Sequence, residues 1–213
     1  MLNRPSVDPW APRRRAAEPG VASDLRRGLV AAWRLASGRA DAVAALFTEP
    51  VSPDAVARIA VRSFAALAFC LAPLAIIEAS PIHLGIVAKP YWHAVTADLL
   101  SELASWLGFL AAVHAIAARR GVGAAWPRFV ALWNWSNLTQ AALLAVAVVP
   151  VWLPVPAVFD VAIRLIFVGW AVMVEWVAIK LSLGLSRAIT TALVALNVTL
   201  QFALDGVVAA LSN

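Results

Sequence analysis

The sequence contains few of the charged residues that cover the surface of a water-soluble domain. Only 14% of its residues are charged, 62% are hydrophobic, and the mean hydropathy is +0.83. A soluble domain carries about 25% charged residues. This deficit excludes an ordinary soluble globular protein and predicts a polytopic membrane protein.

Residues that form crosslinks, metal sites and catalytic motifs are also scarce. Cys70 is the single cysteine, which excludes an internal disulfide framework or a cysteine metal site. His83, His93 and His114 form no metal-binding pattern. Phosphate-binding loops, dinucleotide fingerprints and nucleophile elbows do not occur either. The sequence therefore predicts no metal, no cofactor and no catalytic residue.

Residues 1–23 are rich in proline, arginine and alanine and lack the apolar run of a cleavable signal peptide. This composition predicts a disordered basic tail. The arginine run at 13–15 could suggest nucleic-acid binding, but it precedes membrane segments and lacks the context of a binding fold. We therefore expect no nucleic-acid partner.

Residues 24–56 are predicted to form an amphipathic helix followed by a linker. Apolar residues recur there at spacings of three and four, which places them in one stripe on a helix. The stripe consists of Leu25, Leu29, Trp33, Ala36, Ala40, Val43 and Phe47. A basic amphipathic helix can lie in the plane of the lipid headgroups. It can also pack on the cytoplasmic ends of a helix bundle, and the sequence leaves both interpretations open.

Residues 57–213 contain five apolar segments, each close to the roughly 20 residues that cross about 30 Å of hydrocarbon. Prolines and glycines separate the segments. We therefore predict an all-α polytopic membrane protein, with five transmembrane helices preceded by a cytoplasmic amphipathic helix. The segments are approximately 59–78, 97–117, 128–149, 156–179 and 188–210.

Arginine and lysine alternate between the predicted connections. The chain up to Arg39 holds eight arginines, and the second and fourth connections are basic. The first connection holds only Lys89, and the third holds no lysine or arginine. Cytoplasmic connections of membrane proteins carry the excess of these residues. The pattern predicts a cytoplasmic N-terminus and a periplasmic C-terminus.

Two predicted helices carry polar residues on one face. In the third helix the face spans an arc of about 120°, and in the fifth about 80°. The residues are Asn134, Asn137 and Gln140 in the third helix and Thr190, Asn197, Gln201 and Asp205 in the fifth. Such faces turn toward other helices or toward a water-filled cavity. Interhelical hydrogen bonds and a solute path both remain open, and the fifth helix is the leading expected partner of the third.

Charged residues within the spans are expected to pair. Asp160 and Arg164 share a helical face, so we expect Arg164 to pair with Asp160, with Asp205, or with both. Glu175 is expected to pair with Arg62. The complete predicted intramembrane polar network is Arg62, Glu175, Asn134, Asn137, Gln140, Asp160, Arg164, Asn197, Gln201 and Asp205.

The order of these features, including "WLGFLAAVHAIAARRG" and "RFVALWNWSNLTQAALL", resembles a family of uncharacterised alphaproteobacterial membrane proteins. The resemblance covers residues 25–210, and its five-helix plan is similar to that of the Yip family. The "DLYGP" signature of eukaryotic Yip proteins does not occur, so the resemblance implies no trafficking or small-GTPase role. It implies a bacterial inner membrane, which the arginine- and alanine-rich composition also suits, and it supplies no site residues.

The expected function is that of a non-enzymatic inner-membrane protein, a scaffold or accessory subunit acting through helix–helix contacts. Its expected partners are the lipid bilayer and either another membrane protein or further copies of the chain. The alternative is a small transporter or channel with a polar path lined by the third and fifth helices. A membrane enzyme would instead require Asp98 and Glu102 to converge with His93 on an open pocket.

Overall fold

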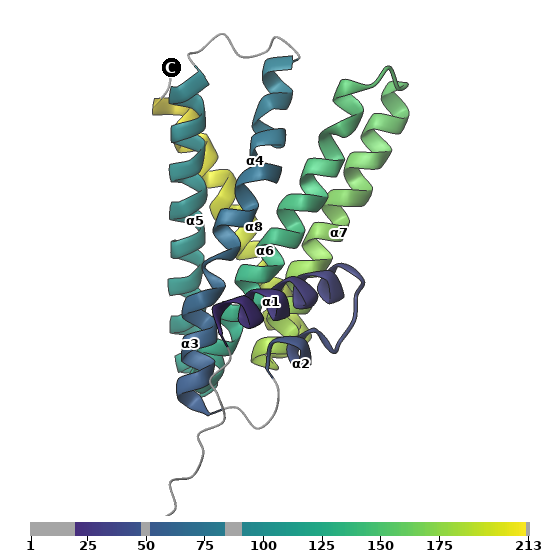
Figure 1. Cartoon of the computed structure of the whole chain (residues 1–213). Coiled ribbons are helices and arrows are strands. Elements are labelled where there is room, and N and C mark those ends of the chain that lie inside the picture. The colour runs from purple at the N-terminus through teal and green to yellow at the C-terminus, as the bar shows by residue number, and fades with distance from the viewer. Residues whose placement is uncertain (1–19, 48–51, 84–90, 212–213) are drawn as a thin grey trace, which may run out of the picture.

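The computed structural model describes residues 20–47, 52–83 and 91–211 (Figure 1). Within these ranges all regular structure is helical, and five helical segments are long and apolar enough to cross a membrane. The predicted all-α architecture with five such helices is therefore confirmed. The segments are Pro53–Ile77, Leu99–Arg119, Gly123–Trp152, Ala157–Leu183 and Arg187–Leu204.

The first of these segments is two helices, α3 (Pro53–Ser63) and α4 (Ala66–His83), where the sequence predicts one. Between them, the backbone N–H groups of Phe64 and Ala65 donate to carbonyls three residues earlier, at 3.3 and 3.1 Å. Such bonds form a short 3₁₀ turn, which interrupts the α-helical hydrogen bonds. The first span therefore has a joint near the middle of its length.

The other long helices are α5 (Tyr91–Arg119), α6 (Trp126–Val148), α7 (Ala157–Leu183) and α8 (Arg187–Leu211). Gly184 ends α7 in the left-handed conformation, at φ +65°, which suits a residue without a Cβ. Helix α6 packs against α7, α4, α3 and α1, whereas α5 packs mainly against α8. Figure 1 shows the α5–α8 and α6–α7 pairs diverging toward one end, with α4 between them in that view.

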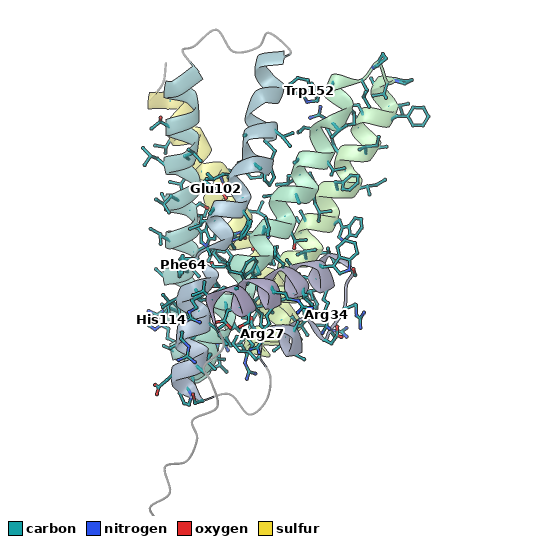
Figure 2. The ribbon with its side chains drawn as sticks, in the orientation of Figure 1. Arg27, Arg34, Phe64, Glu102, His114 and Trp152 are labelled. Atoms are coloured by element: carbon teal, nitrogen blue, oxygen red, sulfur yellow. The ribbon has the colours of Figure 1, made fainter. Side chains whose placement is uncertain are left out.

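Most described arginines and lysines gather at the other end, which we call the basic end. It holds α1, α2, the start of α3 and the α5–α6 and α7–α8 connections, and Arg27, Arg34 and His114 mark it in Figure 2. Among the described residues, Arg164 is the one arginine or lysine that belongs to the opposite half. The basic end comprises Arg26, Arg27, Arg34, Arg39, Arg58, Arg62, Arg119, Arg120, Arg128, Lys180 and Arg187.

The predicted continuous amphipathic helix is instead two helices. Helix α1 (Val21–Ala36) begins slightly before the expected boundary at residue 24, and α2 (Ala42–Leu46) follows a reversal of the chain. Gly38 lies at φ +68°, and the N–H of Arg39 donates to the carbonyl of Arg34 at 2.8 Å. This is a glycine-dependent C-terminal cap. The prediction of one helix is wrong because Gly38 ends α1.

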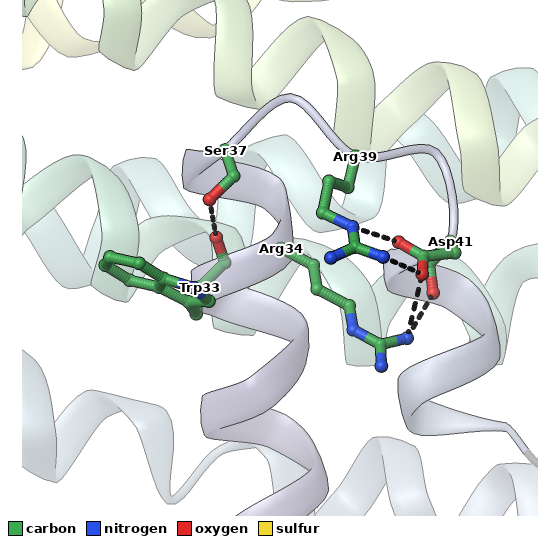
Figure 3. Close-up of polar contacts among 5 residues, drawn as sticks. All are labelled: Trp33, Arg34, Ser37, Arg39 and Asp41. Carbon is green, nitrogen blue, oxygen red and sulfur yellow. Dashed lines mark hydrogen bonds and ion pairs between the residues drawn. The ribbon is translucent and has the colours of Figure 1, made fainter.

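Charged side chains stabilise the turn between α1 and α2 (Figure 3). Asp41 accepts hydrogen bonds from Nε and Nη2 of Arg39 at 3.2 and 3.0 Å, and forms an ion pair with Nη1 of Arg34 at 3.2 Å. The hydroxyl of Ser37 donates to the carbonyl of Trp33 at 2.9 Å. The turn is therefore held by its own residues at the basic end.

Helix α1 packs on the bundle mainly through a face other than the predicted apolar stripe, although Leu25 of the stripe also contacts the core. Leu29 and Trp33 of that stripe are 44% and 73% exposed. The packing interpretation is thus supported through another face, while contact of Trp33 with lipid headgroups stays a prediction. The buried face comprises Asp24, Gly28, Ala31, Ala32 and Leu35.

Three polar contacts fasten α1 to the spans. Thr139 of α6 donates to the carbonyl of Ala32 at 3.0 Å, and Trp170 Nε1 of α7 donates to the carbonyl of Ala36 at 2.8 Å. Arg62 of α3 forms an ion pair with the buried carboxylate of Asp24. The expected pairing of Arg62 with Glu175 is therefore wrong, because α1 brings a carboxylate to the guanidinium at the basic end.

We expect Asp24→Asn to lower the free energy of unfolding by about 2 kcal/mol, between the values for exposed and fully buried ion pairs. The amide cannot neutralise Arg62, so α1 loses part of its attachment. Thermal unfolding of the purified protein in detergent measures the loss. Asp54→Asn, an exposed change on α3, is the control, and equal midpoints for the two variants would contradict the prediction.

Candidate functional site: a polar cavity between the spans

A cavity of about 520 Å³ lies between the five spans, and each of α4 to α8 contributes to its wall. Part of the wall is apolar and includes Leu74, Leu144 and Phe202. The volume falls within the roughly 300–1,000 Å³ typical of small-molecule sites. The cavity is therefore large enough for an organic solute.

Amide side chains of α6 and α8 line the same cavity. Gln140 Nε2 donates to Asn137 Oδ1 at 3.1 Å, within α6. Gln201 Nε2 of α8 donates to Glu102 Oε2 of α5 at 3.0 Å. Asn197, one helical turn before Gln201 on α8, contributes a further amide to the wall. The two polar faces that the sequence predicts therefore face a shared space instead of bonding directly to each other.

Glu175 of α7 and Trp133 of α6 are cavity-lining residues with open hydrogen-bonding atoms. Each is 2% exposed. Asn197 is the polar neighbour of the Glu175 carboxyl, but Oε1 has no hydrogen-bond partner among the described residues, and neither does Trp133 Nε1. Buried polar atoms are nearly always satisfied, because leaving one unpaired is costly. The wall thus has one unmatched acceptor and one unmatched donor.

The charge of the wall is of one sign. None of the 19 described residues that line the cavity is lysine, arginine or histidine, whereas Glu102 and Glu175 are both acidic. Figure 2 places Glu102 well away from the basic end marked by Arg27 and Arg34. The cavity therefore favours positive charge over negative charge.

A buried chain of hydrogen bonds lies beside the cavity. Trp106 Nε1 donates to Asn134 Oδ1 at 3.0 Å, and Asn134 Nδ2 donates to Ser63 Oγ at 2.8 Å. Ser63 in turn donates to the carbonyl of Ala60 at 2.5 Å. The chain joins α5, α6 and α3. The expectation that helix α8 would hold Asn134 is wrong, because α5 and α3 approach α6 at this level.

An aromatic cluster fills the bundle between the cavity and the basic end. The Trp133 ring lies 5.1 Å from Phe109, 6.0 Å from Phe129 and 5.7 Å from Trp106, measured between ring centroids. Phe109 and Phe129 are fully buried. In the described part of the structure, the polar residues of the cavity wall end at this cluster. They therefore do not form a continuous polar path from the cavity to the basic end.

Two further predicted residues lie outside the cavity. Arg164 Nε and Asp160 Oδ1 are 2.8 Å apart on α7, so this predicted pair is confirmed. The side chain of Asp205 lies outside the described part of the structure, and its pairing with Arg164 stays a prediction. The side chains of His93 and Asp98, invoked for an enzyme, are also outside it. The described residues contain no group of three His, Cys, Asp or Glu that could hold a metal.

Four polar or tryptophan residues of the cavity wall are absent from the predicted network. They are Glu102, Ser105, Trp106 and Trp133. Glu102 and Trp106 are four residues apart and share a helical face. The sequence signal that could have indicated these cavity residues is a carboxyl group one helical turn from an indole inside an apolar span.

Searches against family models, curated proteins and solved structures find no match to this chain. The resemblance to an alphaproteobacterial membrane family with a Yip-like plan therefore stays a prediction.

Proposed function

We propose that the chain is a small transporter that binds a polar solute in the cavity between its five spans. The observation that carries this proposal is the buried carboxyl of Glu175, whose Oε1 faces no partner on the wall of a 520 Å³ cavity. A purely structural bundle would be expected to close around such a group and satisfy it. The transporter alternative is therefore better supported than the scaffold.

The proposed orientation follows from the charge distribution. Basic residues of membrane proteins remain on the cytoplasmic side. By this rule we propose that the basic end faces the cytoplasm and the C-terminal end of α8 faces the periplasm. The bacterial inner membrane is part of the same proposal and is supported by the arginine- and alanine-rich composition. The cavity then lies on the periplasmic side of the aromatic cluster of Trp133, Phe109 and Phe129.

Transport by this arrangement requires two conformations. In the described one, the aromatic cluster separates the solute site from the cytoplasm. A second conformation would part the cluster and close the other side. The 3₁₀ joint at Phe64–Ala65 gives α4 a point about which it can tilt while α3 stays attached to α1 through Arg62. The solute would meet Glu175 in both conformations.

The accessory role is the second candidate, and one observation favours it. Trp33 and Leu29 expose an apolar surface on α1 at the basic end, outside the five spans. A partner membrane protein, a further copy of the chain or the lipid headgroups could cover that surface. This role does not require solute access to the cavity.

Cysteine accessibility separates the two candidates. We expect Gln140→Cys, introduced into a Cys70→Ala background, to react with a membrane-impermeant methanethiosulfonate reagent from either side of the membrane. The measurement uses right-side-out and inside-out vesicles that contain the full chain. A transporter exposes residue 140 to one side in each conformation, so both vesicle types should be labelled.

Two control cysteines define the limits of labelling. Leu165→Cys, on the exposed apolar face of α7, should remain unlabelled because it faces lipid. Ser37→Cys, exposed at the basic end, should be labelled from one side only. Protection of the cysteine at position 140 on both sides would show a closed bundle and favour the accessory role. Labelling from one side alone would also contradict transport.

A further inference from the structure

We infer that the solute is a small organic ammonium ion carrying a hydroxyl or carbonyl oxygen, and that Glu175 holds its charge. This inference rests on the proposed function and adds the chemical class of the ligand. The observations that support it are the charge of the cavity wall, the open acceptor and donor, the indole rings and the volume.

The charged residues of the whole cavity wall indicate the sign of the solute's charge. Among the described residues of the wall, Glu102 and Glu175 are acidic and none is lysine, arginine or histidine. A buried charge is stable only when it is paired. An anionic ligand would add a like charge to the wall and find no cation there. A cation would pair with a carboxylate that already lies in the low-dielectric interior.

Glu175 fits the role of counter-ion better than Glu102. Glu102 Oε2 already accepts from Gln201 at 3.0 Å, which ties it to α8. Glu175 is almost completely buried, and its Oε1 is unmatched among the described residues. An ammonium N–H donating to this oxygen would form a charge-assisted hydrogen bond, which is about twice as strong as a neutral one.

The aromatic residues of the wall favour the same class. Trp106 and Trp133 both line the cavity, with ring centroids 5.7 Å apart in an edge-to-face arrangement. Indole faces attract cations. The unmatched Trp133 Nε1 needs an acceptor, and the ammonium group itself has none. A ligand oxygen would satisfy this donor, which is why we specify an amino alcohol or a similar compound.

The volume argues for an organic ion rather than a bare metal ion. About 520 Å³ is far more than a single ion occupies, and the wall beyond the polar residues is apolar, as at Leu144, Val168 and Phe202. Such surface suits the carbon skeleton of a ligand. No cluster of three metal-ligating side chains occurs in the described ranges.

The test compares three compounds that share one skeleton. They are 2-amino-1-phenylethanol, 1-phenyl-1,2-ethanediol and mandelate, which are cationic, neutral and anionic. Ethanolamine, ethylene glycol and glycolate repeat the comparison at smaller size. Isothermal titration of the full chain in detergent should show binding of the ammonium compound of at least one series, with the diol and the acid at least about tenfold weaker.

Variants then identify the residue. We expect Glu175→Gln to weaken binding of the ammonium compound at least about 30-fold, because truncating one partner of a buried charge pair costs several times RT. Glu102→Gln should weaken it less, since that carboxyl is engaged by Gln201. Asp54→Asn, which removes an exposed carboxyl outside the cavity, is the matched control and should bind like the wild type.

The outcomes separate this inference from the proposed function. Equal binding of the diol or the acid, no binding of either ammonium compound, or undiminished binding by the Glu175 variant would overturn the ligand class. The comparison of compounds on the wild-type chain remains decisive if that variant fails to fold. Cysteine labelling at position 140 tests transport without any ligand. Labelling from both sides together with no cation preference would mean a transporter of another solute.

Discussion

Asn134→Leu will destabilise the protein by about 2–6 kcal/mol, because it leaves two buried groups without their partner, at about 1–3 kcal/mol each. Trp106 Nε1 loses its acceptor, and Ser63 Oγ loses its donor. Leucine is similar in size to asparagine, so the loss comes from hydrogen bonding and not from a cavity. The measurement is the thermal midpoint in detergent together with the denaturant concentration that unfolds half of the protein.

Asn137→Leu is the matched control for this change. It lies on the same helix one turn later, and it accepts its described hydrogen bond from Gln140, which also lines the cavity. Gln140 can turn toward the cavity when its acceptor is removed, so we expect a loss well below that of Asn134→Leu. Equal losses at the two positions would show that the hydrogen bonds of Asn134 to Trp106 and Ser63 contribute no more to stability than the bond between Gln140 and Asn137.

The second large effect is expected at the crossing of α1 and α6. Gly28→Ala would place a Cβ 1.9 Å from Trp135 Cε2, far inside van der Waals contact. Trp135 is itself buried, so either its indole must reorient or α1 must move outward. Overpacking of this kind costs about 1–3 kcal/mol, and displacement of α1 adds the loss of the Thr139 bond to Ala32. We therefore expect a total near 3–4 kcal/mol.

Gly169→Ala provides the comparison for the glycine change. Gly169 lies within α7, and an added Cβ there would meet no atom within 4 Å. Alanine is also the better helix former, so this variant should be as stable as the wild type or slightly more stable. The same unfolding assay applies, supplemented by limited proteolysis after Arg34, which should accelerate only when α1 is displaced. Unchanged proteolysis in the Gly28 variant would contradict the expected displacement.

The sequence predicted the spans because the lipid bilayer leaves a backbone few alternatives. Every buried N–H and C=O must be satisfied within its own segment, so a long apolar run with flanking prolines and glycines defines a helix. The alternation of arginines around those runs likewise follows from one physical rule. The Asp160–Arg164 pair was predictable for a similar reason, since both residues are four apart on one helix.

The sequence did not reveal which helices meet. A helical arc shows that Asn134 and Asn137 point in similar directions, but not that one reaches Ser63 while the other faces a cavity. Depth along the spans predicts Glu175 as the partner of Arg62, whereas Arg62 pairs with Asp24 on a helix whose close approach to α6 depends on Gly28. The apolar spacing continues past Gly38 and so predicts a longer helix, although this glycine ends α1. These contacts depend on tertiary packing, which periodicity does not encode.

The hydrogen bond between Glu102 and Gln201 joins residues that are 99 positions apart in the chain. A ribosome delivers α5 to the membrane long before it has synthesised α8, so this acidic helix must wait for its main packing partner through the insertion of two intervening helices. The α6–α7 helical hairpin, by contrast, can assemble as soon as α7 has been synthesised. Biogenesis of this protein should therefore finish at its last helix, and chains stalled before that point should be the ones that quality-control proteases remove.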